Sequence, residues 1–263
     1  MDSEGYKQAW TRPSSLDNLN RRIHDGVPLD QLEERAADRR DTFFEYLFPY
    51  ARPAAGARVL ELGQGVGWIM QSMLDAYPIE EIVGLDVSPV MIDAAQERWS
   101  DPRARYVLYD GLHVPLEDDS FDNVYSVACL QHIEKHHAFL AIKELLRILK
   151  PGGHGTLHLI SIHHLPISGR TYEEECWNHV NTVDAHWMHY YTFDELFVLF
   201  ADALGVTDLD IKYYRTSFFV HFSKGTDRKF VSAEVEQAYF LNRQLPEAIR
   251  PRKARITGSP AAN

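Results

Sequence analysis

The feature that most constrains the fold is a glycine-rich stretch at residues 59–68, which reads Val-Leu-Glu-Leu-Gly-Gln-Gly-Val-Gly-Trp. A short apolar run typical of a buried strand leads into the glycines, and a helical pattern follows them. Glycine permits a positive φ and lets a ligand approach the backbone closely. In open α/β sheets, ligands bind at the carboxyl ends of the strands. The stretch therefore predicts a ligand-binding turn between a strand and a helix of such a sheet.

Strands and helices alternate from residue 57 onward. The predicted strands cover residues 58–62, 81–86, 105–109, 121–127 and 154–160, and the predicted helices cover 66–76, 89–99 and 136–149. This alternation is typical of a parallel sheet with helices on both faces. Two later β-rich runs, 209–214 and 218–222, have only a short connection. They are expected to pair in the antiparallel sense, because a parallel pair needs a long crossover.

The chain divides into three expected parts. Residues 1–56 carry an apolar stripe at helical spacing and are predicted to form an N-terminal helical cap. Residues 57–224 are predicted to form the core, with an inserted substrate cap at about 161–190, where no clear periodicity is present. A capping-box signature that begins at Thr192 predicts a helix to about residue 204. Residues 225–263 are expected to be a mostly helical extension and a polar tail.

The net charge of −11 limits the partners that we expect. An acidic surface repels phosphate backbones, so no nucleic acid is expected. No apolar run approaches the roughly 20 residues that span a bilayer, and the first residues lack a signal-peptide pattern, so we expect a cytoplasmic protein without a membrane partner. Cys129 and Cys176 lie too far apart to suggest a disulfide framework or a zinc site. His186 and His189 lack the acidic groups that would complete a metal site, and no metal is expected.

The spacing of the glycines distinguishes between ligands. A dinucleotide site has the pattern GxGxxG, and here Trp68 stands at the third glycine position while a glycine falls at Gly67. A bulky side chain is unfavourable where a helix and a strand must pack closely. Glu61 places a carboxylate beside the loop, which is unfavourable near a pyrophosphate but acceptable near a ligand that carries ammonium and sulfonium groups. The loop favours a nucleoside without a pyrophosphate, and a nicotinamide-dependent oxidoreductase stays open as an alternative.

Acidic residues end two further predicted strands. Asp86 follows Gly63 by 23 residues, close to the spacing of an acid that binds ribose hydroxyls. Its alternative role is a helix cap, but Ser88 is expected to fill that role before Pro89. Asp110 could accept a hydrogen bond from an adenine amino group, although an Asp-Gly pair also forms turns.

Further motifs join the glycine loop in a fixed order. They are Gly84-Leu85-Asp86-x-Ser88-x-x-Met91, Asp110 followed by residues 114–122, Leu130-Gln131-His132-Ile133, and Leu149-Lys150-Pro151-Gly152-Gly153. Over roughly residues 57–160 the chain resembles the class I S-adenosylmethionine-dependent methyltransferases, and in particular the ubiquinone/menaquinone-type subgroup that acts on small molecules. The resemblance implies a three-layer α/β/α Rossmann-like fold with seven strands in the order 3-2-1-4-5-7-6, strand seven being antiparallel. It also implies S-adenosyl-L-methionine as the cofactor.

The resemblance assigns cofactor-binding roles by position. Glu61 and the loop from Gly63 through Gln64 and Gly65 to Gly67 would hold the methionine part of the cofactor. Ribose would bind Asp86, and adenine would contact Val87, Asp110 and Gly111. The remaining implied cofactor residues are Met91, Val127 and Ala128. The Asn/Asp-Pro-Pro-aromatic motif of amino-group nucleic-acid methyltransferases is replaced here by Ser126-Val127-Ala128-Cys129.

Candidates for the chemistry lie after the fourth and fifth predicted strands. A hydroxyl acceptor needs a base, and histidine suits this role; the candidates are His132, His163 and His164. The candidate substrate-binding residues are Tyr6, Trp10, Gln131, Trp177, His186 and Tyr190. We expect methyl transfer to oxygen of a metabolite, natural product or sugar, with transfer to nitrogen or carbon as alternatives. A non-catalytic cofactor-binding subunit also stays open, and a homodimer is compatible with the sequence.

Overall fold

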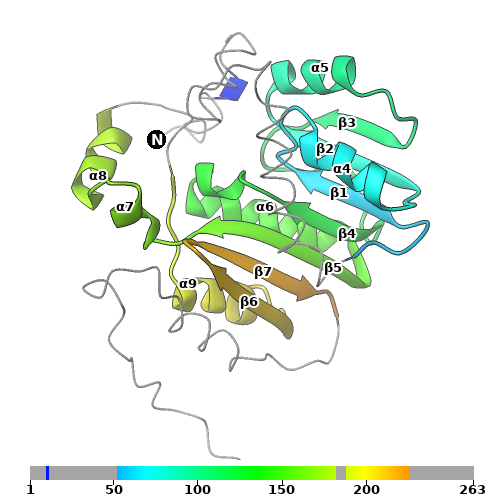
Figure 1. The fold of residues 1–263 in the computed structure, drawn as a ribbon. Coiled ribbons are helices and arrows are strands. Elements are labelled where there is room, and N and C mark those ends of the chain that lie inside the picture. The colour runs from blue at the N-terminus through cyan, green and yellow to red at the C-terminus, as the bar shows by residue number, and fades with distance from the viewer. Residues whose placement is uncertain (1–9, 12–51, 182–187, 226–263) are drawn as a thin grey trace, which may run out of the picture.

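A seven-stranded mixed sheet forms the centre of the molecule (Figure 1). The computed structural model describes residues 10–11, 52–181 and 188–225. The strands are β1 (Arg58–Leu62), β2 (Glu81–Asp86), β3 (Ala104–Leu108), β4 (Phe121–Ser126), β5 (Leu149–Ile160), β6 (Asp208–Tyr214) and β7 (Ser217–Ser223). Their order is β3-β2-β1-β4-β5-β7-β6, with β1 to β5 parallel and β7 antiparallel to both β5 and β6. The predicted fold class and strand order are confirmed.

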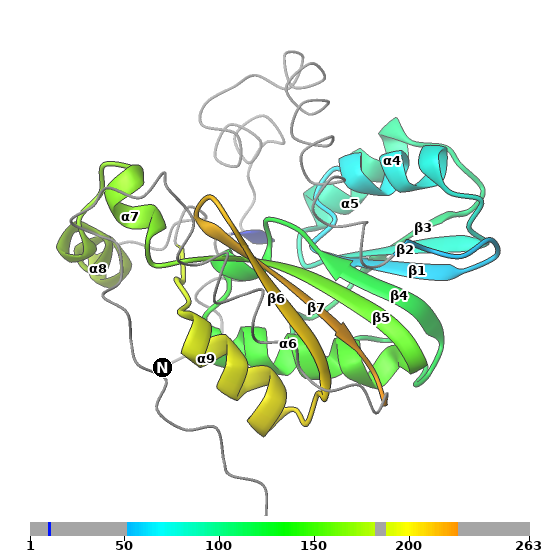
Figure 2. The same cartoon turned by 60° about the horizontal axis from the view of Figure 1, so that its bottom comes forward.

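Helices cover both faces of the sheet (Figure 2). On one face lie α4 (Trp68–Ala76) and α5 (Pro89–Arg98). On the other face lie α6 (Lys135–Ile148) and α9 (Phe193–Phe197), which continues as the π-helix η3 (Val198–Ala203). A short 3-10 helix, η2 (Leu130–His132), follows β4, while α7 (His164–Ile167) and α8 (Tyr172–Asn181) follow β5. These three layers agree with the alternation in the sequence.

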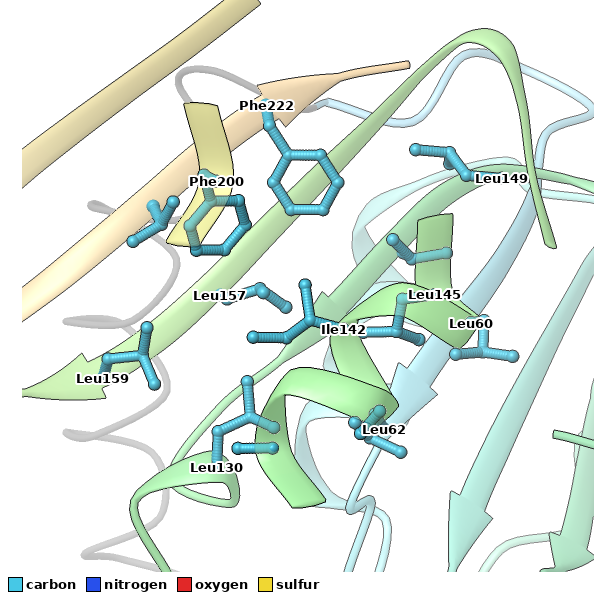
Figure 3. Close-up of a cluster of buried hydrophobic side chains, with 14 of the residues drawn as sticks. Leu60, Leu62, Leu130, Ile142, Leu145, Leu149, Leu157, Leu159, Phe200 and Phe222 are labelled. Carbon is cyan, nitrogen blue, oxygen red and sulfur yellow. The ribbon is translucent and has the colours of Figure 1, made fainter. Parts of the chain in front are cut away.

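The main core lies between the sheet and the layer formed by α6, α9 and η3 (Figure 3). Leu60 from β1, Leu157 from β5 and Ile142 from α6 are fully buried there. A second apolar cluster on the opposite face joins Val59 to Met70 of α4. Because neighbouring residues of a strand point to opposite faces, the apolar run of β1 supplies both clusters. This burial on both faces fixes the position of the glycine loop at the carboxyl end of β1.

The capping box predicted at Thr192 is confirmed, because its side chain accepts from the Glu195 backbone and Glu195 returns a bond to the Thr192 backbone. The helix changes to a π-helix at Val198, which the sequence pattern did not predict. Strand β5 begins at Leu149 rather than at residue 154. The strand includes Gly152, which has a φ of +77° and whose N–H donates to the Lys224 carbonyl oxygen at 2.7 Å.

Residues 161–181 are more regular than the sequence suggested, since both α7 and α8 lie in this segment. Helix α8 starts at a second capping box that the prediction overlooked. The Thr171 hydroxyl accepts from the Glu174 N–H at 3.1 Å, and the Glu174 carboxylate accepts from the Thr171 N–H at 2.8 Å. A Thr-x-x-Glu pattern was therefore the available signal.

In the ranges that the structure describes, no helix combines the length and apolar character needed to cross a bilayer. The same residues contain no group of three or more histidine, cysteine or acidic side chains arranged to hold a metal ion.

Candidate cofactor site

The glycine loop folds over the end of β2. The Gly63 N–H donates to the Leu85 carbonyl oxygen at 2.7 Å, and Gly63 has a φ of +73°. A Cβ atom at this position would lie 2.2 Å from the Cys129 Sγ atom. Both the backbone angle and the close approach of Cys129 therefore require glycine here.

At Gly65 the backbone angle alone favours glycine, without the close side-chain contact that is present at Gly63. The φ of Gly65 is +54°, but a Cβ atom built on it would meet no atom of the described residues within 4 Å. The loop therefore leaves open space beside its backbone, where a ligand can approach. The Gly65 N–H donates to Oδ2 of Asp86 at 2.9 Å, which joins the loop to the end of β2.

Asp86 is the acidic group that the loop contacts directly. Its Oδ1 atom accepts from the Ser88 N–H at 2.9 Å, so each carboxylate oxygen binds one backbone amide and keeps a lone pair for a ribose hydroxyl. Burial raises the pKa of Asp86 to about 6, against the lowering effect of these amides. Ser88 stands at the N-cap of α5 but makes no capping hydrogen bond with its side chain. The predicted N-cap position of Ser88 is confirmed, without the side-chain bond that a capping serine usually makes.

Glu61 lies beneath the loop. It is 2% exposed, and its Oε2 atom accepts from the Tyr125 hydroxyl at 3.0 Å. Burial raises the pKa of Glu61 well above its ordinary value, the Tyr125 bond opposes this shift, and the charge of Asp86 adds to it. The two carboxylates therefore lie within electrostatic range of each other. Gln64 belongs to the loop itself, and its buried side chain packs against Gly84 of β2.

Asp110 is in the predicted place after β3, with half of its side chain exposed. Its Oδ1 atom accepts from the Leu112 and His113 N–H groups at 2.8 and 2.7 Å, and Gly111 has a φ of +84°. Partial burial raises the pKa of Asp110, but the bonds from His113 and Leu112 outweigh it and lower the pKa to about 2. The turn-forming role that the sequence left open is present, and adenine binding stays a prediction.

The segment after β4 reaches the glycine loop. Val127 is 5% exposed and packs in the second apolar cluster, so its side chain does not line an open site. Ala128 is exposed with a φ of +52°, and its N–H donates to Nδ1 of His158 at 3.1 Å. Burial raises the pKa of the Cys129 thiol to about 12, and the charges of Asp86 and Glu61 add to this effect.

Trp10 lies beside the glycine loop. It packs against Val66 of the loop and against Met91, which is 1% exposed. The Trp10 ring also makes an edge contact with His132, with a centroid distance of 5.8 Å. Trp10 and His132 therefore lie together near the glycine loop. Val87, the other predicted adenine contact, is partly buried against the main core.

His163 and His164 make their contacts elsewhere. The His163 ring makes an edge contact with Tyr213 of β6, and Nδ1 of His164 lies 2.9 Å from the Thr216 hydroxyl between β6 and β7. Burial lowers the pKa of both histidines. Both side chains contact the β6–β7 hairpin, whereas His132 contacts Trp10 beside the loop.

The predicted substrate residues are spread over several positions. Gln131 is 4% exposed, and its Oε1 atom has no hydrogen-bond partner among the described residues. Tyr190 is buried against Ile160 of β5, and burial raises its pKa to about 12. Trp177 lies on α8 and is 58% exposed. The remaining candidates, Tyr6 and His186, fall outside the described residues.

Three residues of this region were not among the predicted site residues, namely Tyr125, Cys129 and His158. Tyr125 and Cys129 touch predicted residues only through contacts between distant strands and loops. Their positions could have indicated a place in the site, because Cys129 lies three residues after β4 and His158 lies near the carboxyl end of β5. Burial and, to a smaller extent, the charges of His132 and His164 lower the pKa of His158 to about 4.

Part of the chain matches a known protein family. Residues 59–153 match a family model described as a methyltransferase domain. The demethylmenaquinone methyltransferase of Clavibacter sepedonicus is 32% identical over 122 residues, which cover 46% of this chain and 48% of that protein. The matched stretches span less than half of each of the first curated relatives.

Solved structures share the fold. A Haemonchus contortus phosphoethanolamine N-methyltransferase 2, bound to S-adenosylhomocysteine and phosphomonomethylethanolamine, superposes with a TM-score of 0.56 at 18% identity. That match covers 72% of this chain and 53% of the other chain. The [4+2]-cyclase SpnF superposes with a TM-score of 0.51 at 24% identity, covering 68% of this chain and 60% of its own. Residues 59–153 of this chain therefore carry a methyltransferase domain, and the sheet around it has the strand order that the resemblance to class I S-adenosylmethionine-dependent methyltransferases implied.

Proposed function

We propose that this protein transfers a methyl group from S-adenosylmethionine to a hydroxyl oxygen of a small molecule. The observation that carries the proposal is the open space at Gly65 next to the carboxylate of Asp86. An adenosyl ligand fits these groups, because the loop leaves room at its backbone and the carboxylate can accept from ribose hydroxyls. The loop from Gly63 to Gly67 would hold the methionine part, with the Glu61 charge close by, and Asp110 would accept from the adenine amino group.

The bound cofactor supplies an electrophilic methyl group, and the protein positions the acceptor in line with it. A hydroxyl acceptor must lose its proton during transfer, and His132 is the candidate base. The contact of His132 with Trp10, which packs on the glycine loop, supports this choice over His163 and His164. Trp10 and Gln131 are the substrate contacts that we place nearest to this base.

The alternatives differ in the acceptor or in the reaction. Transfer to nitrogen or carbon needs the same cofactor site, and the relatives include both an N-methyltransferase and a C-methyltransferase. A non-methylating reaction is a second candidate, because the fold is shared with the [4+2]-cyclase SpnF. A nicotinamide-dependent enzyme is disfavoured, since Trp68 occupies the third glycine position of a dinucleotide motif and its ring packs on Trp99 at 5.4 Å. A cytoplasmic location and a homodimer belong to the same proposal.

The test is a screen of small acceptors that follows the release of S-adenosylhomocysteine. Alcohols, phenols, carboxylic acids, amines and carbon acids would each be offered with S-adenosylmethionine, and the products would be identified by mass spectrometry. We expect turnover with a hydroxyl compound and a mass increase of one methyl group on oxygen. Turnover confined to amines or carbon acids would replace the oxygen acceptor by the alternative. Binding of the cofactor without any turnover across the panel would support a non-catalytic or non-methylating role.

A further inference from the structure

We propose that His158 is a positioning residue that sets the glycine loop for cofactor binding by holding Ala128, and thereby Cys129, against Gly63. This inference rests on the proposed function, because it concerns the site for the adenosyl ligand. A chain of contacts runs from β5 and β7, through the segment after β4, to the loop after β1.

Both ring nitrogens of His158 are engaged. The side chain is 5% exposed, its Nδ1 atom accepts from the Ala128 N–H at 3.1 Å, and its Nε2 atom lies 2.9 Å from the Ser217 hydroxyl of β7. Because Nδ1 accepts an amide hydrogen, the neutral ring carries its proton on Nε2 and donates to Ser217. The ring also packs on Phe219 at a centroid distance of 5.1 Å. These contacts fix the ring in one orientation.

The group that His158 binds has an uncommon backbone conformation. Ala128 has a φ of +52°, a region that a residue with a Cβ atom rarely occupies without support from its surroundings. The hydrogen bond to His158 is the support that the structure supplies at the Ala128 amide. Such positions cluster at functional sites, where the surrounding structure maintains them.

Cys129 carries this constraint to the glycine loop. It follows Ala128 directly, and its Sγ atom occupies the position next to Gly63 where a Cβ atom would otherwise stand. Rotation of the Ala128 backbone would therefore move Cys129 away from Gly63 or into it. The position of Gly63 is in turn linked to Gly65, whose N–H binds the Asp86 carboxylate.

A neighbouring histidine on the same two strands provides a matched control. His221 of β7 is 6% exposed, and its Nδ1 atom lies 3.0 Å from the Thr156 hydroxyl of β5. Thr156 stands two residues before His158 on β5, farther from the carboxyl edge that carries the site. The two histidines share burial and a hydroxyl partner across β5 and β7, but His158 also binds the segment after β4.

The experiment compares His158→Leu with His221→Leu in the full chain. The affinity for S-adenosylhomocysteine would be measured by calorimetry, and thermal unfolding would be measured for both variants. We expect a 10-fold or larger loss of affinity for His158→Leu and a change of less than about 3-fold for His221→Leu at similar loss of stability, because losing a hydrogen bond that orders a loop costs on this scale. His158→Asn, whose Oδ1 atom can take the place of Nδ1 and accept from the Ala128 N–H, is expected to recover part of the affinity. Equal affinities for the two leucine variants would overturn the inference.

A double variant tests the mechanism of positioning. Glycine adopts a positive φ without support, so Ala128→Gly is expected to recover affinity in the His158→Leu background and to have less effect alone. Absence of recovery would contradict the role of Ala128. If His158→Leu does not fold, His158→Gln replaces it, because its longer amide can reach Ser217 as Nε2 does but places no acceptor at the Nδ1 position beside the Ala128 N–H; wild-type affinity in that variant would overturn the inference. Failure of the wild-type protein to bind the ligand would instead contradict the proposed function.

Discussion

The cofactor side and the acceptor side of this molecule are built in different ways. On the cofactor side, Gly65 follows β1, and Asp86 ends the adjacent strand β2. The Asp86 carboxylate accepts from the backbone N–H groups of Gly65 and Ser88, which belong to the same two motifs. On the acceptor side, the ring of His163 contacts Tyr213, and His164 lies beside the Thr216 hydroxyl 52 residues away in the sequence. A short motif specifies the first arrangement, whereas the second depends on how distant strands pair. We infer that the glycine loop and its carboxylate follow from local sequence, and that acceptor specificity follows from long-range packing.

The largest effect is expected at the glycine loop, where two similar substitutions separate folding from binding. Gly63→Ala combines a positive φ with a clash against Cys129, and we expect it to lower the free energy of unfolding by about 3 kcal/mol and to abolish cofactor binding. Gly65→Ala carries only the backbone strain, so the loss of stability should be about 1 kcal/mol while binding is still lost. Chemical denaturation and calorimetry measure the two quantities. Normal binding by Gly65→Ala would show that the ligand does not approach this backbone.

The next effect concerns turnover. His132 contacts Trp10 beside the loop, whereas His163 contacts the β6–β7 hairpin. We expect His132→Ala to lower kcat by about 100-fold, the lower end of general-base catalysis, with cofactor affinity nearly unchanged. His163→Ala is expected to lower kcat by less than about 3-fold, well below that range. Near-normal rates in both variants would show that neither histidine acts as a general base.

Replacement of Asp86 tests the cofactor side at its carboxylate. Asp86→Ala should weaken S-adenosylmethionine binding by about 1–3 kcal/mol, the scale of hydrogen bonds to a charged group. Because burial raises the pKa of Asp86 to about 6, wild-type affinity should also decrease as the pH falls below about 6 and the carboxylate is protonated. Calorimetry between pH 5 and pH 8 would measure both effects. A pH profile that Asp86→Ala leaves unchanged would separate this carboxylate from ribose binding.

The same pKa shift predicts a change in the stability of the ligand-free protein. The pKa of Asp86 rises from 3.8 to about 6 on folding, so the folded state binds this proton more tightly than the unfolded state. The contribution of Asp86 is therefore fully present below about pH 4 and is lost as the pH rises through 6, by about 2–3 kcal/mol. Denaturation of wild type and Asp86→Asn across this range measures it. A difference between the two proteins that is constant with pH would contradict the buried, titrating carboxylate.

The smallest effect is expected at Trp10. Its partial packing on Val66, Met91 and His132 predicts that Trp10→Ala weakens cofactor binding by about 3- to 10-fold, equivalent to about 1 kcal/mol. Trp177→Ala on the exposed face of α8 should leave cofactor affinity unchanged and act only on the KM of the acceptor. Equal effects of the two substitutions on cofactor affinity would contradict the assignment of Trp10 to the cofactor side and of Trp177 to the acceptor side.

The sequence predicted the sheet and the cofactor loop because their signals are local. Strands β1 and β2 are short and mainly apolar, and the positive φ angles of Gly63, Gly65 and Gly67 follow from a glycine pattern. Helix α8 was not predicted, although the Thr-x-x-Glu pattern of its capping box is present in the sequence.

Other parts of the site could not be predicted from the sequence. Tyr125 reaches Glu61 across 64 residues, and the partner of the Ala128 amide stands 30 residues away. No local pattern states that His163 and His164 contact the hairpin rather than the loop, because that choice depends on the antiparallel pairing of β6 and β7.

The central claim is that the space at Gly65 and the Asp86 carboxylate bind one adenosyl sulfonium ligand. Calorimetric titration of the full chain with S-adenosylmethionine, followed by a competing titration with NADH, tests it most directly. The account predicts one cofactor molecule bound per chain, with no displacement by NADH. An absence of binding heat with S-adenosylmethionine, together with saturable binding of NADH, would contradict it.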